Sequence, residues 1–535
     1  MSEAFDWNPP THYNFVRDAI GRLARERPND RAILWADGEG AMVDRSFAEL
    51  SDHGARAAAV LQAAGVGRGD TVLILLSREI EWWELMLACL RLGAIASPGT
   101  VQLTPKDIAY RCQAAEARCI IAGTDVAPRV DETPVDAAIP LIHIGGSRPG
   151  WIDYAAAKGK ATPLADIADT AFDDPALCYF TSGTTGQPKM TIHGAGYPLA
   201  HEITGRFWLD LGPGDLHWNM SDTGWAKAAW SSLFAPWLMG AAIFVNHAPG
   251  FDPAAAMDLL ERFPITTLCA PPTAYRMFVR GDLDGRSFLQ LRHCVSAGEP
   301  LNPEVIDLWK SATGLDIHDG YGQTETVLLC CNRAGATRQG AMGRPTPGID
   351  LAVVGHDGAI LPPGEEGDIA LRVGEGRPPG LFLGYRGDPD RTASVFRDGW
   401  YLTGDRATVD ADGFFWFVGR ADDVILSSGY RIGPFEVESV LFEHEAVAES
   451  AVVASPDPTR GEVVKAFIVL ASGHRPSDDL AKALQDHVKQ ATAPYKYPRR
   501  IEFVGSLPKT VSGKIRRKEL RDAEFKGWEF KKADA

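Results

Sequence analysis

The stretch Thr181-Ser-Gly-Thr-Thr-Gly-Gln-Pro-Lys189 decides the fold of this chain of 535 residues. Its small and hydroxyl-bearing residues make a loop whose backbone N–H groups and hydroxyls can turn toward a phosphate chain. The apolar run 176–180 directly before it predicts a buried strand, and α/β proteins bind ligands at such strand ends. It is not a Walker A loop, because Gln and Pro separate Gly186 from Lys189. A polar surface turn is the alternative reading of the same residues.

Length and composition limit what the chain can be. A chain this long predicts two or more domains, since one hydrophobic core does not grow to this size. The net charge of −16 and the pI near 5.3 argue against general nucleic-acid binding, although a local basic site stays open. The N-terminus lacks the apolar region of a signal peptide, and no run of about 18 apolar residues predicts a membrane span. We therefore expect a cytoplasmic enzyme.

The eight cysteines show no C-x-x-C pair and no metal-ligand spacing. Most of them lie in apolar runs. They are therefore expected to be reduced packing residues in a reducing compartment.

Hydrophobic patterning predicts alternating strands and helices in the first part of the chain. The run Thr71–Leu76 is almost continuously apolar, which is typical of a parallel strand covered on both faces. A helix over residues 80–92 and a strand over 94–99 follow, and such alternation favours a doubly wound sheet. The Pro-, Ala- and Asp-rich residues 124–170 predict an irregular connection to the 181–189 stretch.

Three short motifs carry groups that suit a nucleotide. Gly298 leaves room for a flat ring, and Tyr321 lies between glycines where it can stack on a base. Glu325 offers a hard oxygen to Mg²⁺. Asp405 can accept hydrogen bonds from both ribose hydroxyls, as the acid of a dinucleotide site does. Ordinary strand-end turns and surface acids are the alternatives for all of them.

Tryptophans at 218, 225, 230 and 237 surround small residues in the stretch 217–237. An acyl pocket needs such large walls with a few tiny residues between them. Plain core packing explains aromatic residues of this density equally well.

The last part of the chain has a different composition from the rest. Between Lys489 and Lys518 nine Lys or Arg residues accompany one acid, Glu502. A solvated basic face or a landing site for the phosphates of coenzyme A would explain this count. Lys514 follows Gly513 in a tight turn, and an exposed lysine is the simplest reading of it.

Together, these motifs resemble the adenylate-forming (AMP-binding) superfamily over about residues 30–525. The wording Ser221-Asp-Thr-Gly-Trp-Ala-Lys-Ala-Ala-Trp230 is most similar to medium-chain acyl-CoA synthetases. The resemblance implies an α/β fold in which a large N-terminal domain with doubly wound sheets (1–420) holds the acyl and ATP sites. It further implies a small mobile α+β C-terminal cap domain (421–535) with a hinge near Asp422.

The resemblance also implies an activity. An ATP-dependent acid–CoA ligase would join a carboxylic acid, most of all a medium-chain fatty acid, to AMP with release of pyrophosphate. It would then pass the acyl group to the thiol of CoA with release of AMP. A benzoate-like aryl-CoA ligase, a stand-alone adenylation enzyme that loads a carrier protein, and an inactive nucleotide-binding regulator are the alternatives.

The family motifs assign roles residue by residue. Lys514, Thr324 and Glu325 are implied to be catalytic, with Mg²⁺ on Glu325. The ATP contacts are implied to be Thr181, Ser182, Gly183, Thr184, Thr185, Gly186, Gln187, Pro188, Lys189, Gly298, Glu299, Pro300, Asp319, Gly320, Tyr321, Gly322, Gln323, Thr324, Asp405, Arg420 and Lys514. The CoA contacts are implied to be Ser428, Gly429, Tyr430, Arg431, Arg460, Lys489 and Tyr497, and the acyl-site residues Trp225, Gly224 and Met220.

The implied partners are small molecules: a carboxylic acid, ATP and CoA, with no nucleic acid and no membrane span. Acetylation of Lys514 would remove its charge and should stop adenylation. A lysine acetyltransferase and deacetylase acting on Lys514 are therefore a regulatory hypothesis.

Overall fold

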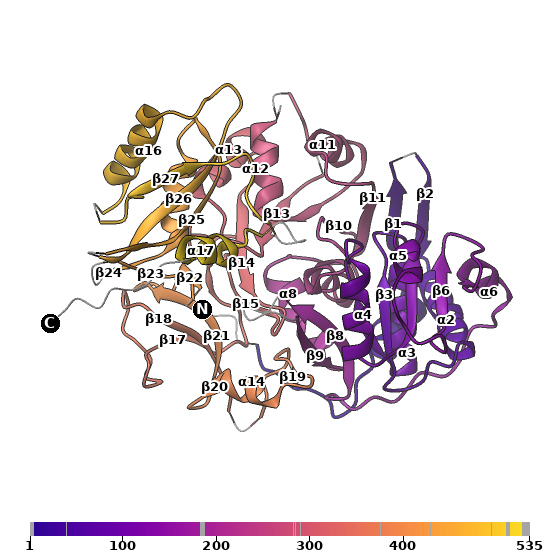
Figure 1. The fold of residues 1–535 in the computed structure, drawn as a ribbon. Helices are drawn as coiled ribbons and strands as arrows, with labels where there is room; N and C mark the ends of the chain where they lie inside the picture. Colours follow the sequence, from indigo (N-terminus) through magenta and orange to yellow (C-terminus); the bar gives the residue numbers. More distant parts are fainter. Residues whose placement is uncertain are drawn as a thin grey trace.

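The computed structural model describes residues 5–38, 40–181, 188–281, 283, 285–288, 290–374, 376–420, 422–427, 430–458, 460–493, 495–509 and 514–526; of Arg431 it describes the backbone only. Below, residues 5–420 are called the body, and residues 422–526 the C-terminal part. Figure 1 shows the body running from indigo to orange and the C-terminal part in yellow.

An eight-stranded sheet carries the strand that leads into the 181–189 stretch. Its order is β19-β9-β8-β4-β3-β5-β6-β7, parallel except where β9 pairs with β8 and β19. The strands are Thr71–Leu75 (β3), Ile95–Pro98 (β4), Ala117–Gly123 (β5), Leu141–Ile144 (β6), Ile152–Asp153 (β7), Pro175–Thr181 (β8), Lys189–Gly194 (β9) and Gly384–Tyr385 (β19). Every residue of β3 is buried, as expected for a strand covered on both faces.

Two helices of the same region begin at capping boxes. Ser46 and Glu49 form a capping box at the start of Phe47–Ala63 (α2), and Thr104 and Asp107 form another at Pro105–Ala114 (α4). The other helices here are Val16–Ile20 (η1, a π-helix), Gly21–Glu26 (α1), Glu81–Leu92 (α3), Ala127–Asp131 (α5) and Tyr154–Lys160 (α6).

The prediction of an irregular connection over residues 124–170 is wrong. This segment contains α5, β6, β7 and α6, and β6 and β7 extend the eight-stranded sheet. The Asp153 side chain accepts a hydrogen bond from the backbone N–H of Ala156 and so begins α6. These elements are too short to give a periodic pattern in a segment rich in Pro, Ala and Asp.

A nine-stranded sheet forms the second half of the body. Its order is β16-β15-β14-β13-β12-β10-β11-β1-β2, with parallel pairing from β14 through β13, β12, β10 and β11 to β1. The strands are Arg31–Asp37 (β1), Met42–Ser46 (β2), Leu216–Asn219 (β10), Ala242–His247 (β11), Thr267–Ala270 (β12), His293–Ala297 (β13), Ile317–Gly322 (β14), Leu328–Cys331 (β15) and Arg344–Pro345 (β16). The helices of this region are Tyr197–Ala200 (α7), Glu202–Phe207 (α8), Ala226–Ala229 (α9), Trp230–Phe234 (η2, a π-helix), Ala235–Leu238 (α10), Pro253–Arg262 (α11), Pro272–Arg280 (α12) and Pro303–Thr313 (α13).

A five-stranded antiparallel sheet closes the body. It contains Leu351–Val354 (β17), Gly367–Arg372 (β18), Phe396–Arg397 (β20), Trp400–Val409 (β21) and Phe415–Arg420 (β22), with Pro389–Ser394 (α14) before β20. Because β21 and β22 are adjacent, Asp405 lies directly opposite Arg420.

The C-terminal part has its own sheet and core. The sheet contains Ile425–Ser427 (β23), Tyr430–Ile432 (β24), Val447–Asp457 (β25), Gly461–Leu470 (β26) and Arg500–Phe503 (β27). Its helices are Pro434–Phe442 (α15), Asp478–Ala491 (α16) and Arg517–Phe525 (α17). In Figure 1 these elements lie beside α12 and α13 of the body. The predicted limits of the two domains, 1–420 and 421–535, stay a prediction.

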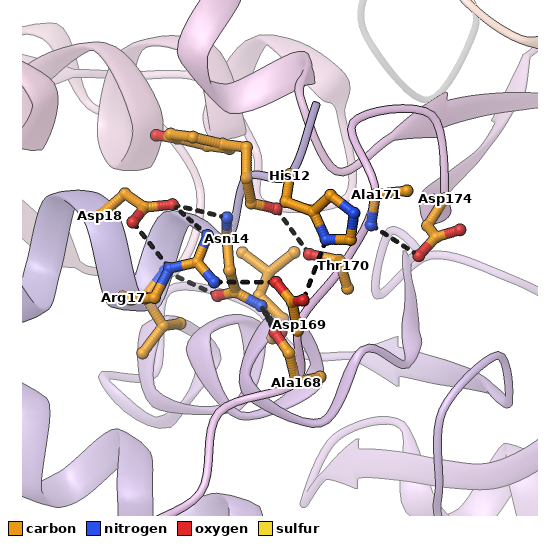
Figure 2. A network of polar contacts seen from close by, with 12 residues as sticks. His12, Asn14, Arg17, Asp18, Ala168, Asp169, Thr170, Ala171 and Asp174 are labelled. Carbon is orange, nitrogen blue, oxygen red and sulfur yellow. Dashed lines mark hydrogen bonds and ion pairs between the residues drawn. The ribbon is translucent and has the colours of Figure 1, made fainter. Parts of the chain in front are cut away.

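Polar contacts fix the segment that leads into β8 (Figure 2). Asn14 donates its side-chain N–H to the carbonyls of Leu90 and Ala168, at 2.9 and 3.0 Å. Asp169 pairs with His12 and Arg17, both at 3.0 Å. The chain therefore reaches β8, and the stretch after it, from a fixed direction.

The eight cysteines are all free and buried, as predicted for packing residues. In the described part of the chain no helix has the length and apolar character needed to cross a membrane.

Candidate active site

Asp405 binds partners from two other segments of the body, the end of β14 and the end of β22. Tyr321 donates its hydroxyl to Asp405 Oδ2 at 2.6 Å, and the Gln323 side-chain amide donates to the same oxygen at 2.7 Å. Arg420 Nη1 donates to Oδ1 at 3.1 Å. These three bonds fix a buried carboxylate and leave Oδ1 able to accept further hydrogen bonds.

The negative charge of Asp405 favours the protonated forms of Arg420 and Tyr321. Desolvation lowers the pKa of the Arg420 guanidinium, but Asp405, Tyr321 and Asp422 together outweigh it, so the net shift is upward. Burial, followed by the charge of Asp405, holds the pKa of Tyr321 well above 10.0. Tyr321 is therefore a hydroxyl donor, and Arg420 a permanent cation, at any ordinary pH.

Glu325 lies beside Lys189, the last residue of the 181–189 stretch. Tyr385 donates its hydroxyl to Glu325 Oε1 at 2.9 Å, and Lys189 Nζ lies 5.0 Å from the centre of the Tyr385 ring. Burial, then Arg391, lowers the pKa of Lys189, while Glu325 raises it. Of the predicted phosphate loop, Thr181, Pro188 and Lys189 are described, whereas Ser182, Gly183, Thr184, Thr185, Gly186 and Gln187 lie outside the described residues.

Two residues that the sequence analysis missed bind the backbone on either side of Glu325. His193, on β9, bonds through Nε2 to the carbonyl of Thr324 at 2.6 Å, and Tyr197 donates its hydroxyl to the carbonyl of Thr326 at 3.1 Å. Burial lowers the pKa of His193 to about 3, so the ring stays neutral and Nε2–H donates. Nothing in the local sequence marks His193, because its partner lies far along the chain.

The turn after β13 places Gly298, Glu299 and Pro300 next to α12. Gly298 has φ +111°, which a residue with a side chain adopts only under strain. Glu299 accepts a hydrogen bond from the Thr273 hydroxyl at 2.7 Å and lies 3.6 Å from Arg276. The turn is therefore held by α12, while a Cβ built on Gly298 would meet no atom within 4 Å, so the backbone there is approachable.

Asp319 and the two glycines beside Tyr321 are packed into the body. Desolvation raises the pKa of the buried Asp319 carboxyl to about 8. A Cβ on Gly320 would lie 2.6 Å from the Trp208 ring, and one on Gly322 would lie 2.5 Å from the carbonyl oxygen of Val327. These three positions shape the strand that presents Tyr321 rather than exposing side chains of their own.

Lys514 comes from the C-terminal part, yet its charge acts on the same group of residues. Its side chain is accessible to solvent, but enough protein surrounds it that desolvation lowers its pKa. Glu299 and Asp405 oppose that shift, while Lys227 and Arg420 add to it. Charges from the turn after β13, from β21 and from β22 therefore act on Lys514.

The predicted acyl-site residues lie in the sequence between the end of β10 and Lys227. A Cβ on Gly224 would lie 2.3 Å from the backbone nitrogen of Thr100, so only glycine fits there. Trp225 is half-buried at the start of α9, and Met220 is half-buried against the core. Lys227, which the sequence analysis did not single out, donates to the carbonyl of Ala297 at 2.6 Å and so ties this stretch to the turn at Gly298.

The predicted CoA residues lie on the C-terminal part, and several of them are already in contact with neighbours. Tyr430 stacks on Tyr495 with ring centres 4.2 Å apart, and Lys489 Nζ lies 4.2 Å from the centre of the Tyr497 ring. The backbone N–H of Arg460 donates to Asp457. Ser428 and Gly429 lie outside the described residues, as does the Arg431 side chain.

The basic residues between 489 and 518 do not form an uninterrupted positive surface. Lys496 pairs with Glu436 at 2.6 Å, Lys509 with Glu449 at 2.7 Å, and Arg517 with Glu438 at 2.5 Å. These acids lie on α15 and β25, outside the window in which the sequence analysis counted charges. Asp422, the predicted hinge residue, accepts a hydrogen bond from Arg521 through its carbonyl.

No group of three or more His, Cys, Asp or Glu side chains is placed to hold a metal ion among the residues that the structure describes. Mg²⁺ usually takes one or two protein carboxylates together with phosphate oxygens and water. A single half-buried carboxylate, Glu325, beside Lys189 fits a magnesium ion that arrives with a nucleotide.

The profile of the AMP-binding enzyme family matches residues 21–386, and that of the AMP-binding enzyme C-terminal domain matches residues 436–514. This chain belongs to the AMP-binding enzymes. Acyl-coenzyme A synthetase ACSM3, mitochondrial, of Mus musculus is 49% identical over 98% of this chain and 93% of the mouse protein. An acyl-CoA synthetase of Brucella canis is 36% identical over 98% of this chain and 96% of its own, with a TM-score of 0.74.

A third AMP-binding enzyme, the anthranilate CoA ligase AuaEII in complex with anthranoyl-AMP, is 31% identical, with a TM-score of 0.87 over 96% of this chain and 98% of its own. The predicted family, the α/β fold and the enzyme class, an acyl-CoA synthetase, are thereby confirmed.

The predicted cytoplasmic location is wrong by the same comparison. The curated relatives of this AMP-binding enzyme in mouse, rat, orangutan and human are all named mitochondrial enzymes. An acidic chain with reduced cysteines suits more than one reducing compartment, so composition could not choose between them.

Proposed function

We propose that this AMP-binding enzyme makes an acyl-CoA thioester in two steps that share the space around Asp405. In the first step a carboxylate oxygen attacks the α-phosphorus of ATP, and pyrophosphate leaves. In the second step the sulfur of CoA attacks the carbonyl carbon of the acyl adenylate, and AMP leaves with the bonding electrons. The observation that carries this proposal is the convergence of Asp405, Arg420, Glu299 and Lys514 from both parts of the chain.

The nucleotide side of the proposal assigns one task to each group. Asp405 accepts the ribose hydroxyls, and Tyr321 and Gln323 hold it in place for that role. The turn at Gly298 lies against the adenine. Lys189 and the loop before it hold the outer phosphates. Glu325 would hold Mg²⁺ together with the nucleotide, and the ion would supply positive charge beside the phosphates.

The first step brings two anions together, and that repulsion is the main barrier that the protein must offset. Two like charges about 4 Å apart repel by roughly 4 kcal/mol at the effective dielectric constant near a protein surface. Lys514, on whose charge Glu299 and Asp405 act, is proposed to contact the acid and the α-phosphate at once, and Arg420 would add a second cation. Such fixed charges stabilise the transition state without having to reorganise.

The acid is proposed to be a medium-chain fatty acid, bound between Trp225, Gly224 and Met220. A benzoate-like acid is the second candidate, favoured by the likeness to the anthranilate CoA ligase. CoA is proposed to meet the C-terminal part near Tyr430, Arg460, Lys489 and Tyr497. Acetylation of Lys514 by a lysine acetyltransferase, reversed by a deacetylase, is proposed to switch off the first step.

The decisive experiment is a panel of carboxylic acids, from C2 to C14 with benzoate and anthranilate, scored for AMP release with and without CoA. We expect AMP release to require both CoA and one group of acids, with pyrophosphate formed in equal amount. An enzyme that releases no AMP with any acid of the panel would contradict the proposal.

A further inference from the structure

Contacts from α12 to α15 and β25 accompany the orientation in which the C-terminal part brings Lys514 near Asp405. Arg280, the last residue of α12, donates to the carbonyl of Val447 at 2.8 Å and to the carbonyl of Ala448 at 2.9 Å. Its guanidinium carbon lies 4.4 Å from the centre of the Phe442 ring. One side chain of the body thus contacts three residues of the C-terminal part.

Phe442 adds an apolar contact between the C-terminal part and the body. It is the last residue of α15, in the C-terminal part, yet it packs against the apolar core formed by α11, α12, α13 and the nine-stranded sheet. Asn302 adds a third contact by donating its side-chain N–H to the Ser439 hydroxyl at 3.2 Å. All three contacts join α15 or β25 to the region of α12 and α13.

Surrounding protein partly desolvates the Arg280 guanidinium, and charged neighbours act on it. Desolvation, then Arg276, lowers the pKa of Arg280, whereas Glu304 on α13 and Glu449 on β25 raise it. Arginine stays charged despite this shift. Its bonds to the two carbonyls are therefore charge-assisted, which makes them stronger than bonds between neutral groups.

We propose that Arg280 and Phe442 form a latch that holds the C-terminal part in the adenylation orientation. Arg280 acts through Lys514 and touches neither substrate, so it is a positioning residue. The inference rests on the proposed two-step function, because it assumes that the thioester step uses a different orientation. Losing the latch should then slow the first step and leave the second step unchanged or faster.

The test measures the two half-reactions separately in Arg280→Ala. Acyl-AMP formation is followed in a single turnover with ATP and acid, and thioester formation starts from supplied acyl-AMP and CoA. We expect the first rate to fall about tenfold with the KM for ATP little changed, since a tenfold change in an orientation equilibrium corresponds to about 1.4 kcal/mol. Phe442→Leu should show the same pattern.

Arg262→Ala is the matched control. Arg262 also ends a helix, α11, is exposed, and lies over a phenylalanine, Phe263, at 5.1 Å, but it makes this contact within the body. Equal loss of both half-reactions in Arg280→Ala, no loss in either, or the same loss in Arg262→Ala would overturn the latch. A wild-type enzyme that forms no acyl-AMP would instead overturn the proposed function.

The double variant Arg280→Ala/Phe442→Leu separates a latch from two unrelated defects. If the two residues act together, the double variant should slow adenylation little more than either single variant does. Effects that multiply fully would show that the residues act independently and would contradict a single latch.

Discussion

Tyr321 and Asp405 join two sheets of the body through one hydrogen bond of 2.6 Å. Tyr321 lies on β14 of the nine-stranded sheet, and Asp405 lies on β21 of the five-stranded sheet. The bond therefore fixes the carboxylate relative to the strand that carries the proposed base-contacting residues. A ribose bound to Asp405 would be aligned with a base near Tyr321 for the same reason.

Asp405→Asn should weaken ATP binding, because the amide loses the negative charge that ribose hydroxyls and Arg420 bind. A hydrogen bond to a charged group contributes roughly 1.5–3 kcal/mol. The KM for ATP should therefore rise by at least about tenfold, measured by pyrophosphate exchange. Tyr321→Phe removes one support of the carboxylate and should cause a smaller rise; a larger rise would show that Tyr321 has a role beyond holding Asp405.

Lys514→Ala should slow adenylation by about a hundredfold or more, on the scale of removing one transition-state donor. Thioester formation from supplied acyl-AMP should survive. Lys482→Ala is the control, since Lys482 is an exposed lysine of α16 paired with Asp486 at 2.9 Å. An equal loss in both half-reactions would refute the assigned role.

The pH profile of adenylation reports on the same lysine. Desolvation lowers the pKa of Lys514 below 10.5, so its ammonium loses the proton at a lower pH than a free lysine does. The rate should therefore fall with rising pH before the ordinary titration range of lysine is reached. Lys514→Arg keeps its charge at high pH, so whatever activity remains in this variant should lack the alkaline fall.

Asp319 should make the protein less stable as pH rises. Burial raises its pKa from 3.8 to about 8, so the folded state keeps a proton that the unfolded state has lost between these values. The free energy of unfolding should then fall with pH in this window, by at most about 1.4 kcal/mol per pH unit from this group. Urea midpoints of the wild type and Asp319→Asn between pH 5 and 8 check this, and parallel curves would contradict it.

Glu325→Gln should raise the magnesium concentration needed for half-maximal adenylation, since a neutral amide binds Mg²⁺ more weakly than a carboxylate. Tyr385→Phe removes the partner of Glu325 Oε1 but keeps the ring beside Lys189. It should shift the magnesium requirement less. An unchanged requirement in Glu325→Gln would place the metal elsewhere.

Trp225→Ala should move acid preference toward longer or bulkier acids, because it removes a large wall of the proposed pocket. Each buried methylene contributes about 0.8 kcal/mol to binding, so the preference should change by roughly fourfold per carbon atom. The acid panel of the proposed function, scored as kcat/KM, measures it. A uniform loss with every acid would mean that Trp225 supports the fold rather than the pocket.

Much of the scaffold was predictable because local signals and tertiary structure agree. The strand predicted at Thr71–Leu76 is β3, and the helix predicted over residues 80–92 is α3. The segment 124–170 was not predictable from pattern, because β6 and α6 are short and depend on neighbouring elements of the sheet. Periodicity needs more residues than these elements have.

The motifs of the candidate site were predictable from the sequence, whereas the residues that hold these motifs in place were not. Asp405 and Glu325 lie in recognisable local sequences, and the structure brings each to its neighbours. His193, Tyr385 and Arg280 act through partners more than 50 residues away, so no local sequence reports them. The ion pairs of the basic stretch could not be predicted for the same reason, since its acidic partners come from α15 and β25.

The stretch from Met220 to Trp230 is joined to the turn at Gly298 by the bond from Lys227 to the Ala297 carbonyl. After a gene duplication, substitutions around Trp225 can therefore change which acids the enzyme accepts, while the residues proposed to bind ATP are inherited unchanged.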